Sequence, residues 1–161
     1  MGFSAESATI LSLPANLVAQ KKGFNVLADV AALGLVYQHT SVATTRRFIR
    51  ENPDTVRRYV KAQVEAVHRL KTDKETEIKV LSKYLAGLKD REILETAYAR
   101  AVADNKLPRK QYPTLEGIKT ILEDLAETEP KAKTAKPEDC VDMRFVQELD
   151  KSGFVDKLYR K

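Results

Sequence analysis

Downstream of residue 45, hydrophobic residues recur every three or four positions, which is the spacing of one face of an α-helix. The clearest stretch follows Pro53, where the apolar positions are Val56, Tyr59, Val60, Val64, Val67 and Leu70. The same spacing predicts helices at residues 45–51, after residue 72, after residue 90, at 114–127 and at 142–150, with a final turn at 154–159. We therefore expect the long C-terminal part of the chain to be a series of amphipathic helices.

Short motifs indicate where several of these helices begin and end. A polar side chain caps the first free amides of a helix, a proline fits its first turn, and a glycine adopts the left-handed conformation that ends it. By these rules we expect helix starts at Asn52-Pro53, at a Thr72/Glu75 capping box and at Asp90, and helix ends at Gly87 and Gly153.

The first 28 residues have a different pattern. Residues 7–12 are small, β-branched or apolar and stop before a proline, which predicts a short buried strand. A helix at residues 14–22 should end at Gly23, and residues 24–28 predict a second strand. A strand, a helix and a strand in this order form a βαβ unit with parallel strands. Residues 40–44 predict a third short strand.

We therefore expect an α/β fold that is predominantly helical, with a short parallel βαβ remnant at the N-terminus. Two or three strands do not make a stable sheet alone, and parallel strands need neighbours and covered faces. The missing strands are expected either from a second copy of the chain, as a homodimer through unpaired strands, or from segments absent from this sequence.

Composition fits one folded domain. The 161 residues are 43% hydrophobic and 32% charged, which is too apolar for a disordered chain. No run approaches the roughly 18 apolar residues of a membrane span, and residues 1–13 lack the basic and apolar regions of an export signal. The single cysteine, Cys140, excludes an internal disulfide and a cysteine-rich zinc site.

Three groups of residues occur in an order that is typical of one protein family. They are residues 10–16 with 22–29, residues 43–49 with 52–56, and residues 136–142 with 149–154. The most specific pieces are Gly23-Phe24-Asn25-Val26-Leu27-Ala28-Asp29 and Leu149-Asp150-Lys151-Ser152-Gly153-Phe154. The chain thereby resembles the C-terminal half of the nitrate/sulfonate/taurine-type substrate-binding proteins of ABC importers, which are bilobed periplasmic binding proteins of type II.

The resemblance implies two parts. Residues 1–42 would be the remainder of lobe two, with its strand-helix-strand and crossover strand, and residues 43–161 the returning helical segment of lobe one. It implies capture of a small anionic or polar organic solute between the lobes, with an ABC transporter permease as partner. The parent protein would be periplasmic, or extracellular and lipid-anchored, with its export signal upstream of Met1. Because half the cleft is absent, we expect this fragment alone to bind ligand weakly or not at all.

A ligand of such a protein lies at the carboxyl ends of strands, where a helix start offers free amides to an anion. The end of the first predicted strand fits this position, and the candidate ligand-binding residues are Ser12, Leu13, Pro14, Asn16, Tyr37 and Thr40. Two alternatives stay open, since Ser12 can simply cap its helix and the last two residues can be ordinary loop residues. Pro14 lacks an amide hydrogen, which weakens the anion cradle.

We expect no enzyme, no cofactor and no metal site. The only histidines are His39, in a loop, and His68, within a predicted surface helix, and neither belongs to a Ser-His-Asp set or a metal-ligand pair. The thiamine-precursor synthases that share this fold rely on a cysteine-rich segment, which this sequence lacks. A fold-related enzyme of thiamine-precursor synthesis stays open as an alternative function.

The formal net charge is +5, but most basic residues alternate with acidic ones, as in residues 74–79. A nucleic-acid binder would gather them on one face, so we expect no nucleic-acid partner, and a helical interaction or nucleic-acid-binding regulatory domain is kept as an alternative. One dense group consists of Arg46, Arg47, Arg50, Arg57 and Arg58. It is either a solvated surface paired with nearby carboxylates or a docking patch for the permease or for phosphate.

Overall fold

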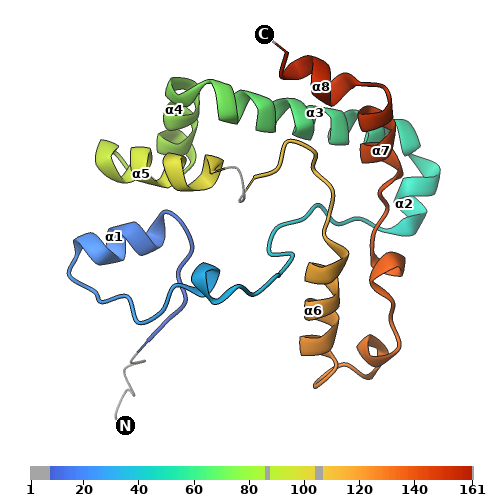
Figure 1. Cartoon of the computed structure of the whole chain (residues 1–161), viewed down its shortest axis with the longest axis horizontal. Helices are drawn as coiled ribbons and strands as arrows, with labels where there is room; N and C mark the ends of the chain where they lie inside the picture. The colour runs from blue at the N-terminus through green and yellow to red at the C-terminus, as the bar shows by residue number, and fades with distance from the viewer. Residues whose placement is uncertain (1–7, 86–87, 104–106, 161) are drawn as a thin grey trace.

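The computed structural model describes residues 8–85, 88–103 and 107–160, and within these ranges every regular element is a helix (Figure 1). In chain order the α-helices and 3-10 helices (η) are α1 (Ala15–Lys21), η1 (Val30–Leu33), α2 (Arg46–Glu51), α3 (Pro53–Thr72), α4 (Lys74–Tyr84), α5 (Arg91–Val102), α6 (Leu115–Leu125), η2 (Pro130–Lys133), η3 (Pro137–Cys140), α7 (Arg144–Lys151) and α8 (Phe154–Leu158).

The predicted α/β fold with a parallel βαβ remnant is wrong, because the described residues contain no strand. The helix between the two expected strands is present as α1, but residues 8–12, 24–28 and 40–44 are irregular (Ser7 lies outside the described residues). A strand exists only when its backbone is paired with a neighbour, and no segment of the described chain lies in position to pair with these three. The predicted homodimer was to form through unpaired strands, and the described residues contain no such strands.

Most of the predicted helix starts are confirmed. Thr45 caps α2, Pro53 is the first residue of α3, and the Asp90 side chain accepts a hydrogen bond from the Ile93 amide at the start of α5. Gly153 separates α7 from α8 with φ +69°, a left-handed conformation that glycine adopts without steric cost. Local rules therefore locate these helices correctly, although the side chain of Asn52 makes no capping hydrogen bond to α3.

The capping box at Thr72 is wrong. Thr72 is the last residue of α3, and its hydroxyl donates to the carbonyl of His68 at 2.8 Å. The cap of α4 is Asp73, whose side chain accepts a hydrogen bond from the Thr76 amide at 3.1 Å. Thr72 and Asp73 are adjacent and both are residue types that cap helices, and Asp73 is the one at the N-cap position of α4. The helix end expected at Gly87 lies outside the described residues.

The 20-residue helix α3 connects the two ends of the molecule. Figure 1 shows α7 and α8 beside α3, α4 and α5 folded at its far end, and α1 against α5. Helix α6 packs with η2 and η3 below α3 and lies apart from α5. None of the described helices is long and apolar enough to cross a bilayer.

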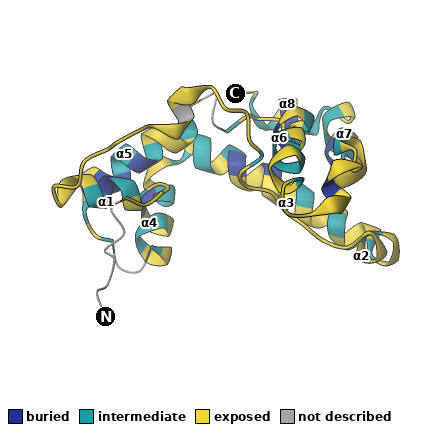
Figure 2. Ribbon diagram, turned by 90° about the horizontal axis from the view of Figure 1, so that it is seen from below, coloured by how far each residue is buried: buried dark blue, intermediate teal, exposed yellow. Residues whose placement is uncertain are grey.

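The hydrophobic core is spread along this arrangement rather than gathered in one centre (Figure 2). Its buried members are Leu17, Val64, Val67, Ile78, Ile93, Leu94, Ala97, Ala132, Phe145, Val146 and Val155. One cluster, of Leu17 with Ile93 and Ala97, holds α1 on α5. No polar or charged residue of the described chain is buried, so helix packing rests on apolar contacts and on ion pairs at the surface.

Large apolar side chains near the N-terminus are exposed. Of the seventeen such residues in the described chain, twelve precede residue 43: Ile10, Leu11, Leu13, Phe24, Val26, Leu27, Val30, Leu33, Leu35, Val36, Tyr37 and Val42. Nine of them lie in residues 24–42, which we call the apolar segment. Scattered exposed apolar residues are normal, but a continuous group of this size is characteristic of an interaction surface.

Candidate functional site

The residues expected to bind an anion near Ser12 form the turn that leads into α1, and the Asn16 amide is already used within that turn. The Asn16 amide donates to the Ser12 carbonyl at 3.1 Å, and the Leu17 amide donates to the Pro14 carbonyl at 3.0 Å and to Asn16 Oδ1 at 2.8 Å. The Leu13–Pro14 peptide bond is cis, and Pro14 itself has no amide hydrogen. The amides of Ser12 and Leu13 have no partner among the described residues. The role of this turn in binding stays a prediction.

Tyr37 and Thr40 lie on a different part of the molecule, against the start of α6. Between them, Gln38 accepts a hydrogen bond from the Thr114 amide at 2.9 Å and donates one to the Thr40 carbonyl at 2.9 Å. Tyr37 and Thr40 are themselves exposed. Within the described ranges, no hydrogen bond or ion pair joins them to Ser12, Leu13, Pro14 or Asn16. The structure thus places the six predicted residues in two groups.

The structure instead has a hollow between α2, η3 and α7, with Leu115 at the start of α6 also lining it. It measures about 810 Å³ and adjoins a smaller hollow of about 330 Å³ between α2, α3 and α7, with Ile49, Arg50 and Arg144 lining both. We call the two hollows together the arginine groove. The charged side chains that line it are Arg46, Arg50, Arg57, Arg144, Glu138, Asp139, Asp142 and Glu148.

The sequence of α2 presents two arginines to this groove. The hydroxyl oxygen of Thr45 accepts a hydrogen bond from the Phe48 amide at 3.1 Å, which fixes Arg46 as the first residue of the helix. Arg50 follows four positions later and therefore lies on the same helix face. Arg46 Nη2 donates to the Asp139 carbonyl at 2.6 Å, which ties α2 to η3. Arg47 is paired with Glu51 at 2.8 Å and does not line the groove.

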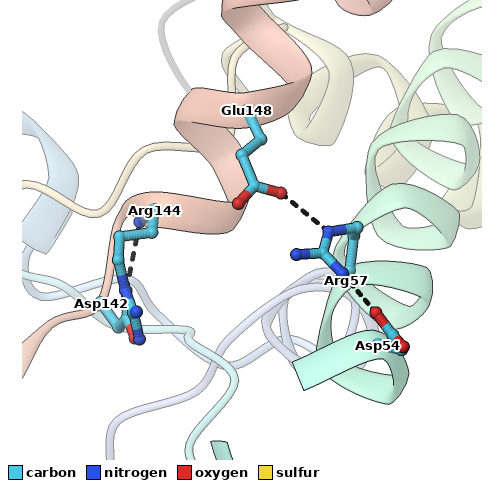
Figure 3. Close-up of polar contacts among 5 residues, drawn as sticks. All are labelled: Asp54, Arg57, Asp142, Arg144 and Glu148. Carbon is cyan, nitrogen blue, oxygen red and sulfur yellow. Dashed lines mark hydrogen bonds and ion pairs between the residues drawn. The ribbon is translucent and has the colours of Figure 1, made fainter. Parts of the chain in front are cut away.

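Arg144 at the start of α7 is held by Asp142 (Figure 3). The two oxygens of Asp142 accept from Arg144 Nε at 2.9 Å and from Nη2 at 2.7 Å, a two-point contact that fixes the guanidinium plane. The hydrogen bond from Arg144 lowers the pKa of Asp142, and the same contact raises the pKa of Arg144. This guanidinium also lies 5.6 Å from the ring centre of Phe145, which is a cation–π distance.

Arg57 of α3 is the third anchored arginine, and Figure 3 shows it between two carboxylates. Its Nε donates to Glu148 Oε2 of α7 at 2.8 Å, and its Nη1 donates to Asp54 Oδ1 at 2.5 Å. The hydrogen bond from Arg57 lowers the pKa of Glu148, and Glu148 in turn raises the pKa of Arg57. Both charges are therefore fixed at neutral pH.

The four arginines that line the groove differ in whether a carboxylate balances their charge. They are Arg46, Arg50, Arg57 and Arg144. Arg57 and Arg144 each have carboxylate partners, whereas Arg46 is bound, within the described part of the chain, only to a neutral backbone carbonyl. Arg50 has no hydrogen bond or ion pair with any described residue. The α2 side of the groove therefore has donor capacity to spare, which is what a carboxylate, sulfonate or phosphate needs.

The groups that would indicate catalysis or metal binding are not gathered here. His39 contacts Thr40, and His68 is half-buried with its ring 4.8 Å from that of Tyr159, so neither histidine lines the groove. Cys140 lines it as an exposed free thiol. In the described part of the chain, no group of three histidine, cysteine or carboxylate residues has the geometry of a metal site.

Of the five arginines that the sequence singled out, the structure brings Arg46, Arg50 and Arg57 to the groove and leaves Arg47 and Arg58 outside. Sequence reasoning missed Arg144 and its partner Asp142. Asp142 lies two positions before Arg144, at the start of α7. This spacing is the local feature that would have indicated an arginine paired with a carboxylate.

Comparison with known proteins finds no matching family model, no matching curated protein and no matching solved structure. The groove must therefore be interpreted from its own chemistry.

Proposed function

We propose that this chain is the substrate-binding component of an ABC importer, present here as a part of it, and that it captures a small anionic or polar organic solute. The resemblance to that family, carried by residues 10–16, 22–29, 43–49, 52–56, 136–139, 141–142 and 149–154, motivates the proposal. The observation that supports it is the arginine groove, in which, among the described residues, Arg50 has no partner and Arg46 has only a neutral one. No bond is made or broken in this function.

The groove supplies one wall of a binding site. Arg50 and Arg46 offer several N–H donors from one helix face, and a planar anionic group can accept two of them at once. Both side chains are exposed, so a contact with them is screened by water and salt. We expect a dissociation constant of about 1 mM or weaker for the isolated chain. Closure of a second lobe over the ligand would exclude water and strengthen the same contacts.

The carboxylates of the groove favour a small ligand over a nucleic acid. Glu138, Asp139, Asp142 and Glu148 line the same hollow as the arginines. A polyanionic backbone crossing this surface would meet negative charge at several points, because its phosphates repeat along the chain. A small anion can instead occupy the α2 side alone. A permease as partner follows from the resemblance and is part of the same proposal.

The proposal is tested by NMR titration of the isotope-labelled chain with sodium methanesulfonate, sodium acetate and sodium phosphate at constant ionic strength. We expect shifts at residues 46–50 and 138–144, with saturation in the millimolar range for at least one anion. Arg50→Gln should remove this saturation. Arg47→Gln is the matched control, because it removes an equal charge from the same helix outside the groove. Equal weakening by both variants, or saturable shifts that lie outside residues 46–50 and 138–144, would refute the proposal.

A further inference from the structure

The apolar segment, residues 24–42, is exposed along nearly its whole length. Leu27 is 79% exposed, Leu33 71% and Phe24 69%, although leucine and phenylalanine are among the residues that folding usually buries. The segment belongs neither to the arginine groove nor to the helix contacts around α3. Its exposure therefore needs an explanation that the arginine groove does not supply.

The backbone of this segment is also open. The Phe24 amide donates to the Ala19 carbonyl at 3.1 Å and the Ala32 amide to the Asp29 carbonyl at 2.9 Å, but the amides and carbonyls of residues 25–28 have no partner in the described chain. Apolar side chains and unpaired peptide groups thus occur together on one stretch. Covering this stretch with another polypeptide lowers the free energy, because water leaves the apolar side chains and the peptide groups acquire hydrogen-bond partners.

Charge separates this segment from the rest of the molecule. Residues 24–42 contain no lysine or arginine, and Asp29 is their only acidic residue, while the whole chain has 28 basic and 23 acidic residues. An anionic membrane surface or a nucleic acid is attracted by basic residues, and the segment offers none. Two copies of the segment can approach each other with almost no like-charge repulsion.

We propose that the apolar segment is an interface at which two copies of this chain associate. The nine large apolar residues of the segment expose on the order of 1,000 Å² in total, and each partner of a stable dimer buries about 800 Å². Contact that covers most of the segment on each copy therefore buries enough area for a stable dimer. The contact is isologous, so that Leu27 and Leu33 of one copy meet the same segment of the other.

The apolar segment and the arginine groove share no residue, since the segment ends at residue 42 and the groove is lined from Thr44 onward. Dimerisation and anion binding can therefore be measured separately. A chain that dimerises, but whose anion binding is equally weakened by Arg50→Gln and Arg47→Gln, would refute the proposed function and leave this inference intact. A monomeric chain whose anion binding depends on Arg50 would refute this inference alone.

The test is sedimentation-equilibrium ultracentrifugation of the whole chain from 1 to 200 μM. We expect a monomer–dimer equilibrium, and Leu27→Glu should raise its dissociation constant at least tenfold, because the change places two carboxylates at the contact. Tyr84→Glu is the matched control: Tyr84 on α4 is also a large exposed side chain, and the same charge there should leave the dimer unchanged.

A second measurement keeps the proposal falsifiable if Leu27→Glu does not fold. Hydrogen exchange of the unmodified chain should slow at residues 25–28 as the protein concentration rises, because these amides acquire cover only in the dimer. A monomer at 200 μM, an equal effect of both variants, or exchange at residues 25–28 that ignores concentration would overturn the proposal. Binding of the segment to neutral phosphatidylcholine vesicles by a chain that stays monomeric would overturn it in favour of a lipid surface.

Discussion

Arg57 of α3 and Glu148 of α7 are separated by 91 positions in the sequence, and Arg57 Nε donates a hydrogen bond to Glu148 Oε2 at 2.8 Å. Their contact joins the long central helix to the C-terminal helices at one edge of the arginine groove. Both side chains are about half exposed, with 44% and 50% of their surface accessible, so water screens the pair. The pair therefore sets the direction of α7 relative to α3 more than it stabilises the fold.

The first prediction concerns the pH dependence of stability. Glu148 and Asp142 have pKa values lowered by their arginine partners in the folded chain. A carboxylate of this kind stabilises the fold above its unfolded pKa of about 4, and that contribution is lost as the pH falls through the lower folded pKa. We expect the urea midpoint to decrease below about pH 4, and to decrease less steeply in Glu148→Gln. The same slope in both proteins would show that the pair is not formed in solution.

The second prediction concerns Phe145, which packs beside the Arg57–Glu148 pair and should contribute more to the free energy of unfolding than the ion pair does. Phe145 is 5% exposed and lies on the face of α7 that contacts α3, with the Arg57 guanidinium 5.9 Å from its ring centre. Phe145→Ala should lower the free energy of unfolding by about 3–5 kcal/mol, because it removes a buried ring and leaves a cavity. Phe48→Ala is the control, since Phe48 on α2 is 41% exposed and its loss should cost about 1 kcal/mol or less. Equal costs in urea unfolding would contradict this packing.

The helices were predictable because their signals are local. Thr45, Asp90 and Thr114 each cap the helix that follows within three residues, and the apolar spacing after Pro53 marks the buried face of α3. Thr72 shows the limit of capping rules, since the neighbouring Asp73, and not Thr72, is the N-cap of α4. A choice between adjacent caps depends on how α3 and α4 pack, which the local sequence does not contain.

The strands were not predictable for a related reason. Residues 24–28 have the composition of a buried strand, but a strand also needs a neighbouring backbone, and composition does not specify one. The candidate site shares this difficulty. Arg46 and Arg50 lie on one helix face by their spacing of four, yet the approach of Arg144 and Glu148 depends on contacts across about 90 positions.

The third prediction separates a cap from an ion pair at Asp90. One oxygen of Asp90 accepts a hydrogen bond from the Ile93 amide at 3.3 Å, and the other contacts Lys21 Nζ of α1 at 2.5 Å. Asp90→Asn keeps an acceptor for the cap and removes the charge, whereas Asp90→Ala removes both. Thermal stability should therefore fall in the order wild type, Asn variant, Ala variant.

Salt provides the control for that order. The difference between wild type and Asp90→Asn should shrink in 1 M NaCl, because salt screens the exposed pair with Lys21, while the difference between the Asn and Ala variants should persist. In a Lys21→Gln background, Asp90→Asn should have little effect. An unchanged effect in that background would mean that α1 is not held on α5 by this pair.

The last prediction concerns the close approach of residues 37 and 38 to α6. A Cβ atom added at Gly117 would lie 2.5 Å from the Thr114 hydroxyl oxygen, 2.7 Å from the Gln38 amide nitrogen and 3.1 Å from the Tyr37 carbonyl carbon. Alanine within a helix is ordinarily about 1 kcal/mol more stable than glycine. Here the clash with backbone atoms outweighs that gain, and Gly117→Ala should destabilise the fold by about 1–3 kcal/mol.

Hydrogen exchange locates the effect of Gly117→Ala. The Thr114 amide donates to Gln38 Oε1 at 2.9 Å, so displacement of residues 37 and 38 should speed its exchange more than that of amides later in α6. Lys119→Ala, at an exposed position of the same helix, should leave both stability and this exchange nearly unchanged. If Gly117→Ala instead stabilised the chain by the ordinary helix increment, residues 37 and 38 would not lie on α6 in solution, because nothing would then oppose the added methyl group.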